Sequence, residues 1–118
     1  MALRLASRLA SRLALMFAIT ALAACDDGVG NDGPLVGGAC IDSSDCEFRC
    51  QQGGDFPQGL CTRPCSVDDD CPGGTFCIDT EGGICMLGCS LPEDCRGGYN
   101  CEGRTNRGHG GDSLVCSN

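Results

Sequence analysis

Twelve cysteines between positions 40 and 116 recur with a regular spacing, and this spacing constrains the fold more than any other feature of the chain. They form three groups of four, with three residues between one group and the next. The groups are Cys40, Cys46, Cys50 and Cys61, then Cys65, Cys71, Cys77 and Cys85, and finally Cys89, Cys95, Cys101 and Cys116. An aspartate directly precedes the second cysteine of each group, at Asp45, Asp70 and Asp94. Such a repeat predicts a linear array of small modules.

Large apolar residues are scarce beside these cysteines, since the whole chain has four Phe, one Tyr and no Trp. Small modules of this kind depend on disulfides, so the reduced chain is not expected to fold. We predict that all twelve cysteines pair within their own groups. Four cysteines allow three pairings, of which we favour first with third and second with fourth. Phe48, Phe76 and Tyr99 are expected to cover the disulfides inside their own modules.

The local sequence predicts short strands and turns inside the modules. Residues 75–78 and 84–87 carry apolar side chains on either side of a Gly-containing connection, which predicts a hairpin. Ser and Asp clusters at 43–45, 67–70 and 91–94 predict turns, because these side chains bond to nearby backbone amides. The expected fold class is therefore small and disulfide-rich: three tandem four-cysteine modules with short β-hairpins and little regular secondary structure.

Residues 1–24 differ in composition from everything that follows them. Arg4, Arg8 and Arg12 give a positive start, and residues 13–24 carry no charge. This apolar stretch is too short for a membrane-spanning helix, which needs about 20 residues. The arrangement is typical of a signal peptide, so we expect the chain to be exported.

The leader ends with Leu22, Ala23 and Ala24, which precede Cys25. This resembles the lipobox of bacterial lipoproteins, at which the cysteine thiol receives a diacylglyceryl group and becomes the first residue. The resemblance implies a lipid bilayer as a partner, through acylated Cys25. It also implies a place in the bacterial envelope, with the outer membrane or cell surface favoured and the inner membrane the other possibility. The alternative is ordinary secretory cleavage, which leaves Cys25 as an odd thiol.

The stretch between Cys25 and the first cysteine group, residues 26–39, contains five Gly and one Pro. This composition predicts a flexible tether. The expected organisation is thus a signal peptide at 1–24, the lipidated Cys25 with its tether at 25–39, and a disulfide-rich repeat domain at 40–118. The repeat units span 40–61, 65–85 and 89–116.

The charge of the chain excludes one class of partner. The chain has no Lys, and its formal net charge is −8. Without residues 1–24, which hold three of the eight Arg and no acidic residue, the charge is −11. Nucleic acid binding needs basic residues that neutralise phosphates, so we expect no nucleic acid partner.

The second and third groups share the most regular pattern, including two Gly after the second cysteine, at 73–74 and 97–98. This pattern resembles the cysteine-rich repeats of bacterial lipoproteins that are similar to the Dickkopf amino-terminal cysteine-rich domain. The resemblance covers residues 65–101 best. The first group differs because it has only three residues between its second and third cysteines, and the third group differs because it has a long final loop. It implies an extracytoplasmic recognition or structural module and brings no catalytic residues.

The sequence offers little support for metal binding or catalysis. Zinc knuckles and thiol redox sites draw on Cys-x2-Cys pairs, and the chain has none. His109 lies between two Gly, which predicts a loop residue rather than a ligand or a base. The acidic runs at 68–70 and 93–94 offer carboxylates to calcium but lack the spaced ligands of an EF-hand loop. We expect no cofactor, no metal site and no enzymatic activity.

The final loop of each group varies in length, from ten to seven to 14 residues. Long loops without structure of their own are usually functional or disordered. We therefore expect residues 102–115 to be dispensable for folding and to form the partner contact, through Arg104, Arg107 and His109. The expected function is a membrane-anchored extracytoplasmic lipoprotein with a structural role or with recognition of a protein or glycan. The alternative is a small disulfide-rich proteinase inhibitor, with Arg104 or Arg107 as its primary residue.

Overall fold

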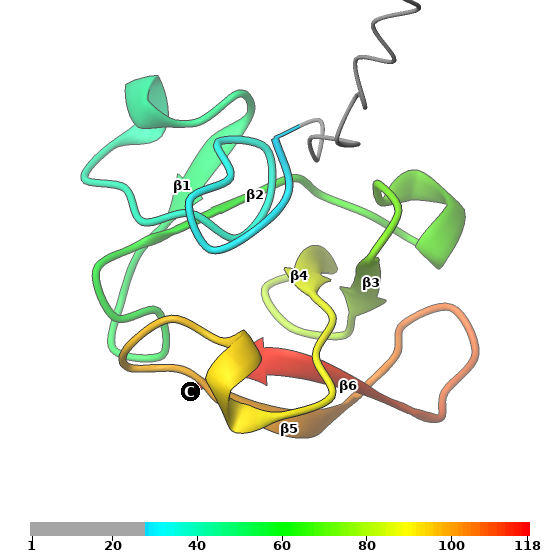
Figure 1. The fold of residues 1–118 in the computed structure, drawn as a ribbon. Helices are drawn as coiled ribbons and strands as arrows, with labels where there is room; N and C mark the ends of the chain where they lie inside the picture. The colour runs from blue at the N-terminus through cyan, green and yellow to red at the C-terminus, as the bar shows by residue number, and fades with distance from the viewer. Residues whose placement is uncertain (1–27) are drawn as a thin grey trace, which may run out of the picture.

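The computed structural model describes residues 28–118, and Figure 1 shows their fold. The leader, the lipidation of Cys25 and the first residues of the expected tether lie outside the described residues. In the described part, no helix has the length and apolar character needed to cross a membrane. Short strands and single turns joined by loops make up the structure (Figure 1).

Each group of four cysteines forms a unit with one 3₁₀ turn and one two-stranded antiparallel hairpin. Unit 1 contains η1 (Ser43–Asp45), β1 (Arg49–Gln51) and β2 (Leu60–Thr62). Unit 2 contains η2 (Asp68–Asp70), β3 (Thr75–Ile78) and β4 (Ile84–Leu87). Unit 3 contains η3 (Pro92–Asp94), β5 (Asn100–Thr105) and β6 (Asp112–Ser117). The expected fold class, the hairpin of unit 2 and the three turns are confirmed.

In every unit the first cysteine bonds to the third and the second to the fourth, which confirms the predicted pairing. The bridges are Cys40–Cys50, Cys46–Cys61, Cys65–Cys77, Cys71–Cys85, Cys89–Cys101 and Cys95–Cys116. The third and fourth cysteines face each other across the hairpin, as Cys77 and Cys85 do in unit 2. The two bridges of a unit therefore lie side by side. Together they fasten the loop that carries the 3₁₀ turn to the hairpin.

The repeated aspartate has a structural role in each turn. In unit 2, Oδ2 of Asp70 accepts hydrogen bonds from the backbone N–H groups of Ser66 and Val67, at 2.8 and 3.2 Å. Asp45 and Asp94 accept the corresponding pairs of bonds in units 1 and 3. The pKa of Asp70 is lowered most by the hydrogen bond from the Ser66 N–H and next by the one from the Val67 N–H. The pKa of Asp94 is lowered in the same way by two backbone N–H groups. Hydrogen bonds of this kind stabilise the charged carboxylate.

The units pack around one apolar cluster, so the expectation of a linear array was wrong. The cluster takes side chains from all three units: Phe56, Leu60, Ile78, Ile84, Met86 and Val115. Isolated backbone bridges also join the units, pairing Pro64 with Ile84, Ile78 with Asn106, and Gly88 with Val115. A single unit has too few apolar side chains to bury a core of its own, and packing three together removes much more apolar surface from water.

Residues 28–39 are folded against the units, which differs from the flexible tether that the composition predicts. Val36 is fully buried. The N–H of Gly37 donates to the carbonyl oxygen of Cys61 at 2.9 Å. A Cβ atom placed on Gly33 or Gly37 would lie only 2.3 Å from a backbone oxygen. These glycines therefore allow close approach of two backbone segments, and flexibility is not their role here.

Residues 102–115 lie largely in a hairpin, whereas the sequence predicted a loop without structure. They run through β5 and β6, whose six-residue strands pair along their whole length. Val115 and Asn106 are fully buried. The Asn106 amide donates to the Asp68 carboxylate of unit 2 at 2.8 Å. The buried contacts to another unit argue against the prediction that this segment is dispensable for folding.

The three aromatic side chains expected to cover disulfides lie in different surroundings. Phe76 is half-buried and packs against the shared apolar cluster. Tyr99 is 7% exposed, and its hydroxyl donates to the carbonyl oxygen of Pro57 at 3.1 Å, so it joins unit 3 to unit 1. Phe48 is 53% exposed and lies under the guanidinium of Arg63, 4.6 Å from the ring centre. The expectation therefore fails for Phe48, and Tyr99 acts between units.

Candidate functional site

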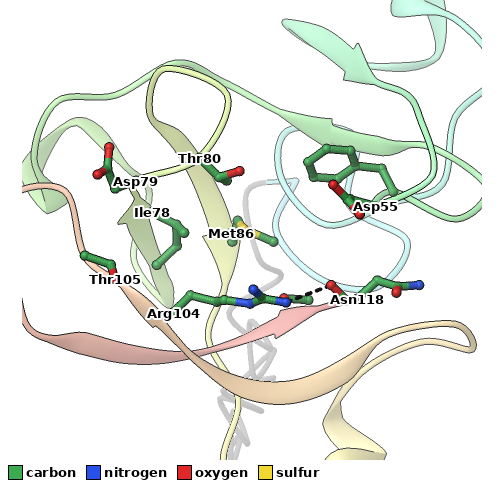
Figure 2. A pocket seen from close by; sticks show the side chains of 10 residues that line it. Asp55, Ile78, Asp79, Thr80, Met86, Arg104, Thr105 and Asn118 are labelled. Atoms are coloured by element: carbon green, nitrogen blue, oxygen red, sulfur yellow. Dashed lines mark hydrogen bonds between the residues drawn. The ribbon is translucent and has the colours of Figure 1, made fainter.

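A cleft of about 360 Å³ lies where the three units meet, and Figure 2 looks into it. Its floor consists of apolar side chains that are at most 5% exposed, from Phe56, Ile78 and Met86. Its rim is polar and comprises Asp55, Asp79, Thr80, Arg104, Thr105 and Asn118. Every unit contributes to this lining. The cleft therefore exists only because the units pack together.

Arg104 extends along one wall of the cleft from β5 (Figure 2). Its Nε donates to the hydroxyl of Ser117 at 2.7 Å. Its Nη2 donates to the carboxylate of Glu102 at 3.0 Å and to the backbone oxygen of Asn118 at 2.8 Å. These partners hold the guanidinium in place, and the Glu102 carboxylate offsets its charge.

Asp79 and Thr80 form the rim on the unit 2 side, directly after β3. The carboxylate of Asp79 pairs with the guanidinium of Arg107 at 3.0 Å, with both side chains well exposed. An exposed pair of this kind contributes little to stability. The Thr80 side chain lies nearer the middle of the cleft, above Met86 (Figure 2).

Asp55 lies on the opposite side of the cleft, in the loop between the third and fourth cysteines of unit 1 (Figure 2). No ion pair found within residues 28–118 includes its carboxylate. Asp55 is exposed, while its neighbour Phe56 is buried in the shared cluster. The packed Phe56 thus fixes the backbone beside a carboxylate that is accessible to a ligand.

Arg96 and Tyr99 of unit 3 hold the unit 1 loop that carries Asp55. The Arg96 guanidinium donates to the carbonyl oxygens of Pro57, at 3.2 Å, and of Gly37, at 3.1 Å. It also stacks on the Tyr99 ring at 4.4 Å from the centroid. Burial raises the pKa of the Tyr99 hydroxyl, and the Arg96 charge acts in the opposite direction. The hydroxyl is therefore a donor at neutral pH, and it supports the same loop through Pro57.

Of the three residues predicted to contact a partner, one lines the cleft and two do not. Arg104 lines the cleft. Arg107 is tied to Asp79 by their ion pair. His109 lies in the connection between β5 and β6, where its Nδ1 accepts a hydrogen bond from the N–H of Gly111 at 3.2 Å. The cleft thus includes only the first of the three predicted contacts.

The cysteine sulfur atoms that lie close together belong to disulfides. Each unit has a trio of cysteines with sulfur atoms within 4.8 Å of one another, and all of these atoms are bridged. Metals bind the thiolate, which a disulfide does not offer. In the acidic run at 68–70, Asp68 accepts a hydrogen bond from the N–H of Cys77 at 2.8 Å, and Asp70 holds its own turn. Both carboxylates have structural roles.

Sequence reasoning did not select Asp55, Thr80 or Met86 as site residues. They lie in two different units and share no motif or spacing. The one available signal was that Asp55 and Thr80 lie in final loops of variable length, because such loops often carry function. That signal pointed equally to every other residue of the final loops.

No protein family, curated protein or solved structure matched the chain. The similarity to Dickkopf-type repeats was not found by these comparisons, and it stays a prediction from the cysteine spacing.

Proposed function

We propose that this chain is an exported, lipid-anchored recognition module that presents the cleft between its units to a ligand outside the cytoplasm. The leader at 1–24 and the lipobox-like residues before Cys25 support export and anchoring. Six disulfides are consistent with an oxidising compartment. No cofactor enters this proposal.

The observation that carries the recognition role is the shape of the cleft. It joins a small apolar floor to a larger polar rim, so a ligand could combine apolar contact with hydrogen bonds. Its walls come from units that are each held by two disulfides and joined by a shared core. Such walls lose little conformational freedom on binding, which favours affinity.

The position of residues 28–39 supports an outward-facing cleft. Figure 2, which looks into the cleft, shows this segment behind it. Gly28 follows Cys25 by three residues, a reach of at most about 11 Å in an extended chain. Because residues 28–39 are folded against the units, lipid on Cys25 would hold the body close to the bilayer. The cleft would then open away from the membrane.

The observed contacts do not favour the proteinase inhibitor alternative. An inhibitor of trypsin-like enzymes needs a basic side chain that extends freely into the protease. Arg104 is instead held along the cleft by hydrogen bonds to Ser117, Glu102 and Asn118.

Lipid attachment is tested with the full chain, expressed in a bacterium that processes lipoproteins and fed labelled palmitate. We expect the wild-type protein to take up label and to partition into the detergent phase of Triton X-114. The matched Cys25→Ser chain should take up no label and should lose this partitioning. A wild-type protein that is unlabelled and stays in the aqueous phase would contradict the anchor.

The recognition role is tested in the same cells with a photoreactive amino acid. It is placed either at Thr105, on the exposed rim of the cleft, or at Glu93, an exposed position in η3. We expect discrete crosslinked products from position 105 and none from position 93. Equal crosslinking at both positions, or none at either, would argue for a structural coat instead.

A further inference from the structure

The charged groups around the cleft differ in how far their charges are already compensated. The Arg104 guanidinium has a carboxylate partner in Glu102 at 3.0 Å, and its other hydrogen bonds go to Ser117 and Asn118. Asp79 has its own cation in Arg107 at 3.0 Å. Asp55 belongs to no ion pair found in the described part of the chain. The uncompensated charge at the cleft is therefore negative.

The charge of the whole protein acts in the same direction. Without its leader the chain carries five Arg and 16 acidic residues, a formal net charge of −11. A field of this sign attracts cations and repels anions, and a concave site concentrates the effect. An anionic ligand would meet both this field and an Arg104 that is already paired. A cation is therefore the better electrostatic match.

The charges favour a cation, and the apolar floor of the cleft favours a ligand that also has an apolar part. Met86 and Ile78 belong to the floor of the cleft, and Figure 2 shows Thr80 above Met86 and Asp55 to its right. An aliphatic stem could cover this apolar floor while its charged end reaches the Asp55 carboxylate.

We propose that the cleft binds a primary ammonium group on a methylene stem, as a lysine side chain of a peptide carries. The stem lies on Met86 and Ile78, and the ammonium donates hydrogen bonds to the Asp55 carboxylate and the Thr80 hydroxyl. An ammonium has three donors and no acceptor, which suits a rim that offers a carboxylate and a hydroxyl as acceptors. This assignment rests on the proposed recognition function and names its ligand class.

Met86 offers a direct probe of this site. It is the only methionine after residue 24, so a ¹³C-methyl methionine label reports a single signal once the leader is removed. The labelled full-length protein, with its lipid and in nonionic detergent, is titrated with N-acetyl-lysine amide. The uncharged N-acetyl-norleucine amide has as many aliphatic side-chain carbons as the lysine derivative but no ammonium. It serves as the matched ligand. N-acetyl-glutamate amide tests for an anion site.

We expect the lysine derivative to shift the Met86 signal with a dissociation constant on the order of 1 mM, since a small ligand buries little surface. The norleucine derivative and the Asp55→Asn variant should each bind at least tenfold more weakly. Glu93→Gln makes the same charge change at an exposed position outside the cleft, and it should bind like the wild type. Added salt should weaken binding, because the carboxylate is exposed.

Three results would overturn the proposal: no shift of the Met86 signal, equal binding of the norleucine derivative, or tighter binding of the glutamate derivative. The second result would make the cleft an apolar slot, and the third would make it an anion site. A failure here is separable from a failure of the proposed function. Palmitate labelling and crosslinking at position 105 report on anchoring and on recognition of any other ligand.

Discussion

Units 2 and 3 have the same disulfide frame in different surroundings. Cys65–Cys77 and Cys89–Cys101 each close a sequence separation of 12 residues, and the aspartate before the second cysteine makes the same two backbone hydrogen bonds in both. Yet Cys77 is fully buried, whereas Cys89 and Cys101 are half-buried. The four cysteines thus determine the shape of a unit, and its neighbours determine how much of it is buried.

The hairpins of these two units differ in length, and this difference creates the interface between them. Strands β3 and β4 have four residues each, whereas β5 and β6 have six. The longer hairpin brings Asn106 onto unit 2, where it is fully buried beside Ile78. It also places Arg104 along the cleft. The most variable loop of the repeat is therefore the one that assembles the site.

The largest effect should come from removing a single disulfide, in one variant from unit 3 and in another from unit 2. Replacing Cys89 and Cys101 by Ala should lower the free energy of unfolding by about 2 to 4 kcal/mol, through the chain entropy of a short loop. Replacing Cys65 and Cys77 by Ala should cost the same amount and about 1 to 2 kcal/mol more, because buried sulfur atoms leave a cavity. Urea unfolding followed by circular dichroism measures both.

The two variants are controls for each other, since the closed loops have equal length. Equal losses would show that burial adds nothing to the bridge of unit 2. A larger loss in unit 3 would mean that its hairpin, and not unit 2, is the centre of the fold.

A smaller effect should separate two neighbouring residues of β6. Val115→Ala removes the unit 3 side chain from the shared cluster and should cost about 2 kcal/mol, at about 0.8 kcal/mol for each lost methylene plus a cavity term. Leu114→Ala changes a side chain that is 52% exposed and should cost less than about 0.5 kcal/mol. The same urea experiment measures both. Similar costs at 114 and 115 would contradict the packing of unit 3 on unit 2.

The smallest effect concerns acid stability, which the two units should share equally. The pKa values of Asp70 and Asp94 are lower in the folded protein than in the unfolded chain, where an aspartate has a pKa of about 3.9. Each carboxylate therefore stabilises the fold at pH values above the unfolded pKa, and this stability is lost as the pH falls through the folded pKa. Asp70→Asn and Asp94→Asn keep an acceptor oxygen without the titration. Each should flatten the loss of stability below about pH 4 to a similar degree.

Urea midpoints between pH 2 and 6 measure this effect. Glu93→Gln removes one negative charge without touching a turn aspartate and should leave the slope unchanged. If only one of the two aspartates affects the slope, the turns of units 2 and 3 are not equivalent.

The features that the sequence determined are those set by contacts within one unit. The pairing of the twelve cysteines, the hairpin of unit 2 and the three turns were predicted from spacings of a few residues. Such short separations leave the chain few alternatives, because a disulfide or a turn closes only over a limited distance.

Tertiary structure alone decided how the units pack, and with that it decided the cleft. Asn31 accepts a hydrogen bond from the backbone of Arg96, 65 residues away, and Asn106 bonds to Asp68 across 38 residues. Contacts of this kind involve backbone groups and single polar side chains, which leave no periodic pattern in the sequence. Glycines at 33 and 37 were typical of a tether by composition, yet they serve close backbone approach. Whether a glycine is flexible or tightly packed depends on what lies next to it in space.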